Sequence, residues 1–92
     1  MRYDVQFTNQ FKRDLKLAHK QGKDTSLLFA VIDRLANGEP LDAKYRDHSL
    51  TGNYKDCREC HIEPDWLLVY EVIDDTLVLM LYRIASHAEL FR

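Results

Sequence analysis

The spacing of apolar residues changes along this chain, and the order of the changes limits the folds that it can adopt. Tyr3, Val5 and Phe7 alternate with polar residues, which predicts a half-buried strand. Apolar residues then recur at helical spacing in two segments, the first ending at Gly22 and the second at Gly38. From residue 54 onward the pattern favours strands again. The predicted order is therefore strand, two helices, three strands.

Polar residues that cap helices stand before both helical segments. Thr8 and Asn9 precede the first segment, and Asp24 or Thr25 begins the second, where a side-chain oxygen accepts from free backbone N–H groups. The apolar stripes of the two segments are Phe11, Leu15 and Ala18, followed by Leu27, Leu28, Val31, Ile32 and Leu35. The connection is short, so we expect an antiparallel helical hairpin.

The second half of the chain is predicted to be a long loop followed by three strands. The loop covers Glu39 to Asn53, and a loop of this length in a compact domain is often functional. Turn residues separate the strands at Glu63-Pro64-Asp65 and at Asp74-Asp75. The predicted strands and the short terminal turn are Tyr54 to Ile62, Trp66 to Ile73, Thr76 to Ile84, and Ser86 to Arg92.

These elements predict one α+β domain spanning residues 1–92, with the order β-α-α-β-β-β. The helical hairpin is expected to pack on one face of an antiparallel sheet, because helices and strands occupy separate stretches of the chain. A chain of 92 residues, 46% of them apolar, can bury one modest core. The sequence has no segment of the length and hydrophobicity that a membrane requires and no signal peptide, so we expect no membrane partner and a cytoplasmic location.

The charge of the chain is unevenly distributed. The net charge is −2, which by itself does not indicate a nucleic-acid-binding protein. Residues 1–23 nevertheless carry six Lys or Arg against two Asp, a local charge of +4, whereas the remaining residues carry seven basic and thirteen acidic groups. The basic side chains include Lys12, Lys16 and Lys20 on one face of the first predicted helix. They form either a solvated helix face or a contact surface.

Three histidines in the second half are candidates for proton transfer: His48 in the loop, His61 in a strand and His87 near the end. On the strand that contains His61, Cys57 and Glu59 are expected to share its face. Asp65 follows the end of that strand, and Arg83 lies in an apolar strand, where a charge needs a partner or a ligand. Each histidine taken alone is more readily explained by a surface or structural role, but their common location around the sheet favours a shared site.

The segment Cys57-Arg58-Glu59-Cys60-His61 also matches the C-x-x-C-H pattern of haem attachment. Haem attachment is disfavoured, because the sequence has no export signal and two cysteines three positions apart on a strand face opposite ways. Zinc binding through these thiols is weakly indicated, because a second cysteine pair is absent. We expect two reduced cysteines that pack in the core, and no cofactor or metal.

A combination of motifs resembles the YafQ branch of the RelE/ParE toxin superfamily. The resemblance covers nearly the whole chain. The residues that carry it are Asp47-His48-Ser49-Leu50, Gly52, the run from Arg58 to Tyr70 that contains H-x-E-P-D-W, Arg83, and the ending Ser86-His87-Ala88-Glu89-Leu90-Phe91.

The resemblance implies a metal-independent endoribonuclease that cleaves mRNA in the ribosomal A site. The 2′-hydroxyl of the RNA would attack the adjacent phosphate, a reaction that needs a base, an acid and positive charge. The implied catalytic residues are His48, His61, Asp65 and His87, with the division into base and acid left open. The implied substrate-binding residues are Arg83 at the scissile phosphate, Phe91 stacking on a base, Glu59 and Trp66.

The resemblance also implies partners. A small antitoxin is expected to bind the chain in a heterotetramer, with Lys12, Lys16 and Lys20 as candidate contacts, and to be the only link to operator DNA. The other partners are mRNA and the ribosome. Toxins of this family are usually basic, and this chain departs from that pattern. The alternatives are a ParE-like inhibitor of DNA gyrase, which shares the fold and needs no proton-transfer groups, and a purely structural domain.

Overall fold

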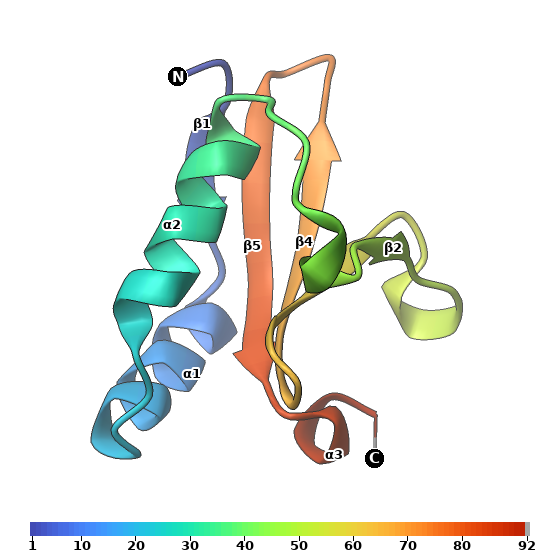
Figure 1. Cartoon of the computed structure of the whole chain (residues 1–92). Coiled ribbons are helices and arrows are strands. Elements are labelled where there is room, and N and C mark those ends of the chain that lie inside the picture. Colours follow the sequence, from blue (N-terminus) through green and yellow to red (C-terminus); the bar gives the residue numbers. More distant parts are fainter. Residues whose placement is uncertain (92) are drawn as a thin grey trace.

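The computed structural model describes residues 1–91 as one five-stranded sheet with a helical hairpin on one face (Figure 1). The strands follow one another across the sheet in the order β1-β5-β4-β3-β2. Their bounds are Asp4–Phe7 for β1, His48–Ser49 for β2, Arg58–Glu63 for β3, Trp66–Ile73 for β4 and Val78–Ala85 for β5. The predicted α+β architecture is therefore confirmed. Of the predicted terminal turn, Arg92 lies outside the described residues.

The sheet differs from the expected antiparallel one at its first strand. Neighbouring strands from β2 to β5 are antiparallel, but β1 runs parallel to β5, with Asp4 opposite Val78 and Phe7 opposite Leu81. The rest of the fold lies between β1 and β5 in the sequence, so no tight turn dictates their relative direction. The sheet is consequently mixed.

Both helices begin at the predicted caps. The Thr8 hydroxyl accepts from the Phe11 N–H at the start of α1 (Asn9–Lys20), and Asp24 accepts from the Ser26 N–H at the start of α2 (Thr25–Ala36). The buried face of α2 is Leu28, Val31, Ile32, Leu35 and Ala36. Leu27, which we expected in this face, is 42% exposed. No helix among residues 1–91 is long and apolar enough to cross a membrane.

The sheet carries a core on each face. The helix side holds the larger core, which includes Phe11, Leu28 and Cys60, whereas the other side holds a smaller one formed by Cys57, Leu67, Val69, Ala85 and Leu90. The two cysteines thus lie on opposite faces as free, buried thiols, as predicted. Burial raises the pKa of the Cys60 thiol to about 12, so that thiol stays protonated and unreactive.

The long loop before β3 is more ordered than the sequence indicated. It contains two 3₁₀ turns, Ala43–Tyr45 (η1) and Gly52–Tyr54 (η2), on either side of the two-residue strand β2. The strand predicted to start at Tyr54 begins only at Arg58, because the chain first turns through Asp56 with a φ of 73°. The loop also supplies Asp47, which accepts from the Tyr70 hydroxyl at 2.6 Å and from Arg58 Nε at 3.3 Å.

A buried carboxylate, that of Asp14, joins α1 to the C-terminal half of β5. β1 stops at Phe7, so the N–H of Ile84 further along β5 has no strand to bond on that side. The Asp14 carboxylate of α1 accepts a hydrogen bond from the Ile84 N–H at 3.1 Å. It also accepts two hydrogen bonds from the Arg83 guanidinium, at 2.9 and 3.1 Å. Gln10 donates a fourth bond to the same carboxylate at 3.0 Å.

We predict that Asp14→Asn lowers the free energy of unfolding by about 2–4 kcal/mol, because it removes one partner of a largely buried, hydrogen-bonded ion pair. Urea denaturation followed by circular dichroism measures the change. Asp33→Asn, an exposed change on α2, is the matched control and should cost less than about 0.5 kcal/mol. Equal stabilities of the two variants would contradict the prediction.

Candidate active site

The three candidate histidines lie together on the sheet face opposite the helices. The ring centroids of His48 and His61 are 6.2 Å apart, and those of His61 and His87 are also 6.2 Å apart. Phe91 continues the row, with its ring 5.3 Å from that of His87, and Tyr54 lies edge-on to Phe91 at 5.9 Å. Residues from the loop, β3 and the end of the chain thus form one arc of rings.

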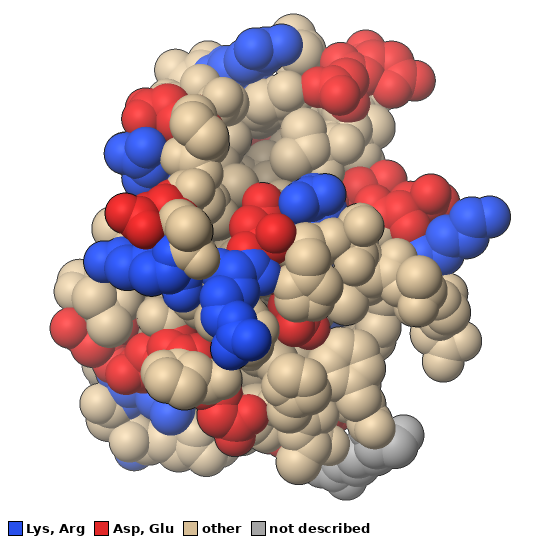
Figure 2. All heavy atoms as spheres, turned by 45° about the vertical axis from the view of Figure 1, so that its right-hand side comes forward, with Lys and Arg blue, Asp and Glu red and all other residues tan. Residues whose placement is uncertain are grey.

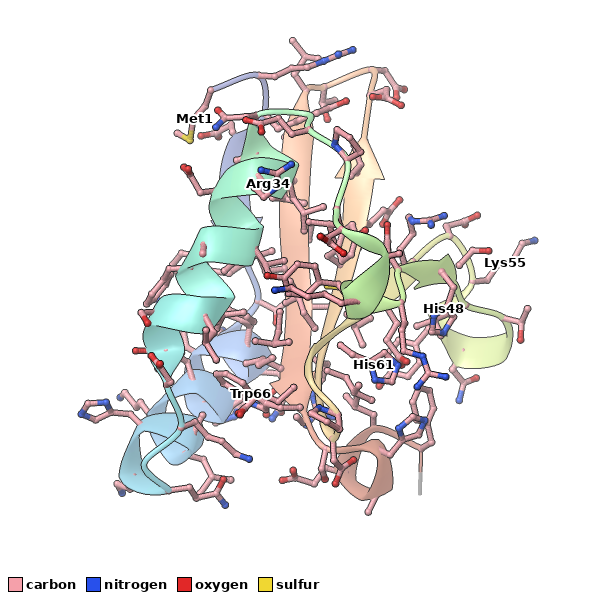
Figure 3. All side chains as sticks on the ribbon, viewed as in Figure 1. Met1, Arg34, His48, Lys55, His61 and Trp66 are labelled. Carbon is pink, nitrogen blue, oxygen red and sulfur yellow. The ribbon has the colours of Figure 1, made fainter. Side chains whose placement is uncertain are left out.

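Strand pairing explains why His48 and His61 meet at Glu59. His48 lies directly opposite Glu59 in the β2–β3 pair, and His61 follows Glu59 by two positions on β3, so all three side chains share a face. The Nε2 atoms of His48 and His61 lie 3.5 and 3.6 Å from Glu59 Oε1. Figure 3 shows both labelled imidazoles on the same side of the sheet.

Glu59 is the most deeply buried charged residue of the site. Its side chain is 2% exposed, compared with 49% for His48 and 12% for His61. The second carboxylate oxygen, Oε2, is buried and has no hydrogen-bond partner among residues 1–91. A buried carboxylate with an unsatisfied oxygen is costly, so the site is suited to bringing a proton or a cation to Glu59.

Backbone carbonyls orient both imidazoles. The Nδ1 of His48 lies 2.7 Å from the carbonyl oxygen of Arg46, and the Nδ1 of His61 lies 3.3 Å from that of Pro64. A carbonyl can only accept, so each Nδ1 donates its proton. In the neutral ring each Nε2 is therefore a free acceptor directed at Glu59.

His87 begins α3 (His87–Leu90), and Asp65 holds it there. The Asp65 carboxylate accepts from the His87 backbone N–H at 2.9 Å, across the β3–β4 turn. Ser86 and Glu89 form a reciprocal capping box on the same turn, and the bonds from the Ser86 backbone and side chain lower the pKa of Glu89. Asp65 is thus a positioning residue for the exposed His87 ring.

Arg83 is held by α1, on the part of β5 that extends beyond the end of β1. Its Nε and Nη2 atoms donate to Asp14, and this pairing raises its pKa. The remaining terminal nitrogen, Nη1, is outside that pair, and the side chain is 23% exposed. A bulge in the β4–β5 pairing next to Val69 places Arg83 opposite Val69, whose side chain belongs to the core on the histidine face.

The structure corrects the expectation for Trp66. Its side chain lies in the core on the helix face, it is 3% exposed, and the Lys23 ammonium lies 5.9 Å from its ring centroid. Figure 3 shows Trp66 on the side of the sheet that faces the helices, away from His61. Trp66 is therefore a core residue on the face of the sheet opposite the three histidines.

Sequence reasoning did not identify Asp47 and Tyr54 as site residues. Asp47 ties the chain just before His48 to Tyr70 and Arg58, and Tyr54 packs beside Phe91. In the sequence, Asp47 was noted only as part of a motif, and Tyr54 only as the first residue of a predicted strand. Their positions depend on loop geometry that residue spacing does not encode.

The charge around the site is mixed. Figure 2 shows acidic and basic side chains next to one another on the face turned toward the viewer, without one broad basic surface. Among residues 1–91, the one group of three or more His, Cys, Asp or Glu that could hold a metal ion is His48, Glu59 and His61, whose candidate ligand atoms all lie within 4.8 Å of one another. The arrangement can therefore exchange protons or ligate a cation.

Comparisons with known proteins identify relatives along the whole chain. Residues 3–92 match the model of a family described as "Bacterial toxin of type II toxin-antitoxin system, YafQ". The chain is 40% identical over 89 residues to the mRNA interferase toxin YafQ of Escherichia coli K12, covering 96% of this chain and 95% of that protein.

Two solved structures are similar throughout. A metal-bound toxin from Helicobacter pylori has a TM-score of 0.92 at 45% identity, covering 97% of this chain and 99% of that one. The E. coli DinJ-YafQ toxin-antitoxin complex has a TM-score of 0.89 at 39% identity and covers 100% of both chains. These similarities confirm the predicted RelE-like fold.

We predict that Asp65→Ala destabilises α3 locally without unfolding the protein. The substitution removes the hydrogen bond from the His87 N–H to Asp65, which holds only this four-residue helix. Amide hydrogen exchange at the His87 N–H should accelerate at least about tenfold, while global stability falls by less than about 1 kcal/mol. Asp75→Ala, in the β4–β5 turn, is the control and should leave this exchange unchanged. Unchanged protection of His87 in Asp65→Ala would show that the bond does not hold α3.

Proposed function

The chain belongs to the YafQ family of bacterial type II toxins, and we propose that it is an mRNA interferase that arrests translation by cutting mRNA. The observation that carries the proposal is the arc of three imidazoles, His48, His61 and His87, beside the buried carboxylate of Glu59. Proton transfer to and from RNA hydroxyls requires groups of this kind at neutral pH.

The proposed reaction uses the RNA's own 2′-hydroxyl as nucleophile. The 2′-oxygen forms a bond to phosphorus, the bond from phosphorus to the 5′-oxygen breaks, and a cyclic phosphate and a 5′-hydroxyl result. His61 takes the 2′-hydroxyl proton, because the anionic Glu59 lies 3.6 Å from its Nε2 and stabilises the protonated ring. His87, whose ring has no carboxylate neighbour of this kind among residues 1–91, donates a proton to the leaving 5′-oxygen.

The remaining residues position the RNA. Phe91 is 45% exposed beside His87, so a nucleotide base can stack on its ring. Arg83 offers Nη1 to the scissile phosphate while Asp14 holds its other nitrogens, and His48 shares the stabilisation of the developing charge. Asp65 contributes by holding the His87 backbone rather than by exchanging protons.

We place the cleavage on the ribosome, in the cytoplasm, where mRNA is held in an extended form. The local +4 of residues 1–23 includes three exposed lysines of α1, Lys12, Lys16 and Lys20, which can face ribosomal RNA. Because this contact would be electrostatic, binding to the ribosome is expected to weaken as the salt concentration increases.

We further propose a small antitoxin as the cognate partner, as DinJ is for the E. coli YafQ. A groove between β1 and the helical hairpin is lined by exposed Phe7 and Phe29, 49% and 51% exposed, with Lys12 and Lys16 at its rim. An amphipathic antitoxin segment with acidic residues would cover these rings and pair with the lysines.

The ParE-like alternative, inhibition of DNA gyrase, is not favoured. Such an inhibitor has no use for the arc of imidazoles at Glu59. A primer-extension assay on translating ribosomes, run beside a gyrase supercoiling assay, distinguishes the two functions. Cleavage of mRNA with unaffected gyrase supports the proposal, and the opposite pattern refutes it.

We predict that cleavage does not need a transition metal. Toxin treated with EDTA and then freed of the chelator should cleave mRNA within about twofold of the untreated rate, on ribosomes in buffer that contains only magnesium. The reason is that the proposed steps use imidazoles alone as acid and base. Loss of cleavage that zinc restores would contradict it.

We predict that His87→Gln lowers the cleavage rate by about 10²–10⁴-fold, because glutamine cannot donate and recover a proton in the neutral pH range. Melting temperature should stay within a few degrees, because the ring is exposed. His19→Gln, at an exposed position of α1, is the control and should retain activity. Cleavage at the normal rate by folded His87→Gln would remove His87 from the mechanism.

A further inference from the structure

A cavity of about 350 Å³ lies along the outer edge of β3 and includes His61 in its lining. The border strand β2 pairs only with Arg58 and Glu59, so in the part of the chain that the structure describes the later residues of β3 border no further strand. The turn η1 and the first turn of α2, both in contact with β3, supply the other walls. The volume lies within the roughly 300–1,000 Å³ of small-ligand sites.

The cavity borders the groups that orient two of the imidazoles. Arg46 and Pro64 both line it. The carbonyl oxygen of Arg46 lies 2.7 Å from His48 Nδ1, and that of Pro64 lies 3.3 Å from His61 Nδ1. The His61 side chain, 12% exposed, forms part of the wall itself. A ligand in the cavity would therefore contact the residue that is proposed to take the 2′-hydroxyl proton.

The lining offers an apolar surface next to that imidazole. Leu27 is 42% exposed although it belongs to α2, and the cavity is where its side chain lies. Partly buried Tyr45, Ile62 and Pro64 continue the apolar lining toward β3. A nucleobase is a flat and largely apolar group, and proteins bind single-stranded RNA by covering its bases with such side chains.

The charges of the lining suit the other parts of a nucleotide. Lys44 and Arg46 are exposed and form no ion pair with an acidic side chain among residues 1–91. The Lys44 ammonium lies 5.2 Å from the ring centroid of Tyr45, which keeps the charge at the cavity. Glu63 is the one acidic residue of the lining. Cations position a phosphate, and a carboxylate accepts from the N–H groups on the edge of a base.

We propose that this cavity binds the nucleotide on the 5′ side of the cut, whose 2′-hydroxyl attacks. The proposal rests on the proposed function, in which His61 takes the proton of that hydroxyl and His87 serves the leaving oxygen of the next nucleotide. The cavity adjoins His61, and Phe91 lies beside His87, toward the other end of the row of rings. The two nucleotides that flank the scissile phosphate therefore bind at opposite ends of the catalytic row.

The lining then divides the recognition between backbone and base. Lys44 and Arg46 pair with the phosphate on the 5′ side of the bound nucleotide, and Glu63 accepts from its base and so contributes to sequence preference. The two cations outnumber the single carboxylate, which favours RNA as the occupant over an acidic peptide of the antitoxin.

Binding is measured with a dinucleotide that cannot be cleaved, because its first ribose is 2′-O-methylated, and that carries a 5′-phosphate. In NMR titrations of the labelled protein, changing the first base should alter the shifts of the Leu27 methyl groups, and changing the second base those of the Phe91 ring. Lys44→Gln should weaken binding at least about threefold, as expected for one exposed charge pair. Removing the 5′-phosphate should weaken binding to the original protein similarly and should matter less to Lys44→Gln.

Matched variants separate the cavity from the general charge and apolar surface of the protein. Lys55→Gln removes the same charge from an exposed loop position outside the lining, and Figure 3 shows Lys55 pointing away from His61. Leu27→Gln should weaken binding at least about threefold, whereas Leu77→Gln alters a similarly exposed leucine, 50% exposed, in the β4–β5 turn. Both control variants should bind the dinucleotide as the original protein does.

Three results would each overturn the proposal. The first is unchanged Leu27 signals in the presence of the dinucleotide, and the second is a response of Leu27 to the second base instead of the first. The third is a loss of binding in Lys55→Gln as large as in Lys44→Gln. Leu27 signals that respond to an antitoxin peptide and not to the dinucleotide would assign the cavity to a protein partner and overturn it as well.

Cleavage on translating ribosomes gives a second readout. Lys44→Gln should raise KM at least about threefold with kcat within about twofold, because its contact is present both before and during the reaction. Glu63→Gln should change the relative rates of cleavage after the four nucleotides at least about threefold, and unchanged preference would overturn its role. If the protein cleaves no mRNA in any condition, the proposed function fails, and the titrations still decide whether the cavity binds a nucleotide.

Discussion

The buried carboxylate of Asp14 is the contact on which the arrangement of the whole domain depends. β1 is four residues long and β5 is eight, so the lower part of β5 has no strand beside it. The Asp14 side chain replaces that strand with a single acceptor for the Ile84 N–H, and it holds Arg83 with two further bonds. Because Asp14 comes from α1, the same contact sets where the helical hairpin lies against the sheet. The chain that leaves β5 at Ala85 therefore enters α3, and with it His87, from a fixed point.

The helical hairpin covers only one face of the sheet, and this leaves the other face for chemistry. β4 lies in the middle of the three long strands and is buried on both faces from Trp66 to Tyr70, which explains its continuous apolar sequence. The same feature explains why the face of Trp66 was not predictable from spacing. A strand with polar residues on one side reveals its orientation, whereas a strand that is apolar on both sides does not. The bulge in β3 between His61 and Glu63 adds a shift of register that spacing also omits.

The sequence predicted most reliably what is decided locally. The caps at Thr8 and Asp24 and the turn at Pro64 depend on a few neighbouring residues, and the structure has each of them. The parallel β1–β5 pair depends on residues more than seventy positions apart, and the two-residue strand β2 is too short to show a period. His48 reaches Glu59 only through β2, so the histidines could be identified as candidates but their meeting at a buried carboxylate could not.

The lengths of the strands also govern how the folded protein behaves toward copies of itself. The outermost strands of the sheet, β1 and β2, have four and two residues, and the eight-residue apolar strands lie inside. Where β1 ends, side chains meet the free backbone groups of β5, because Asp14 accepts from the Ile84 N–H and the Thr8 hydroxyl donates to the Tyr82 carbonyl, which leaves fewer groups onto which another molecule could add a strand. The segment from Trp66 to Tyr70, with its aggregation-prone composition, is shielded on both sides by β3 and β5. The fold can therefore expose a ribonuclease-like face to solvent and still resist polymerising edge to edge.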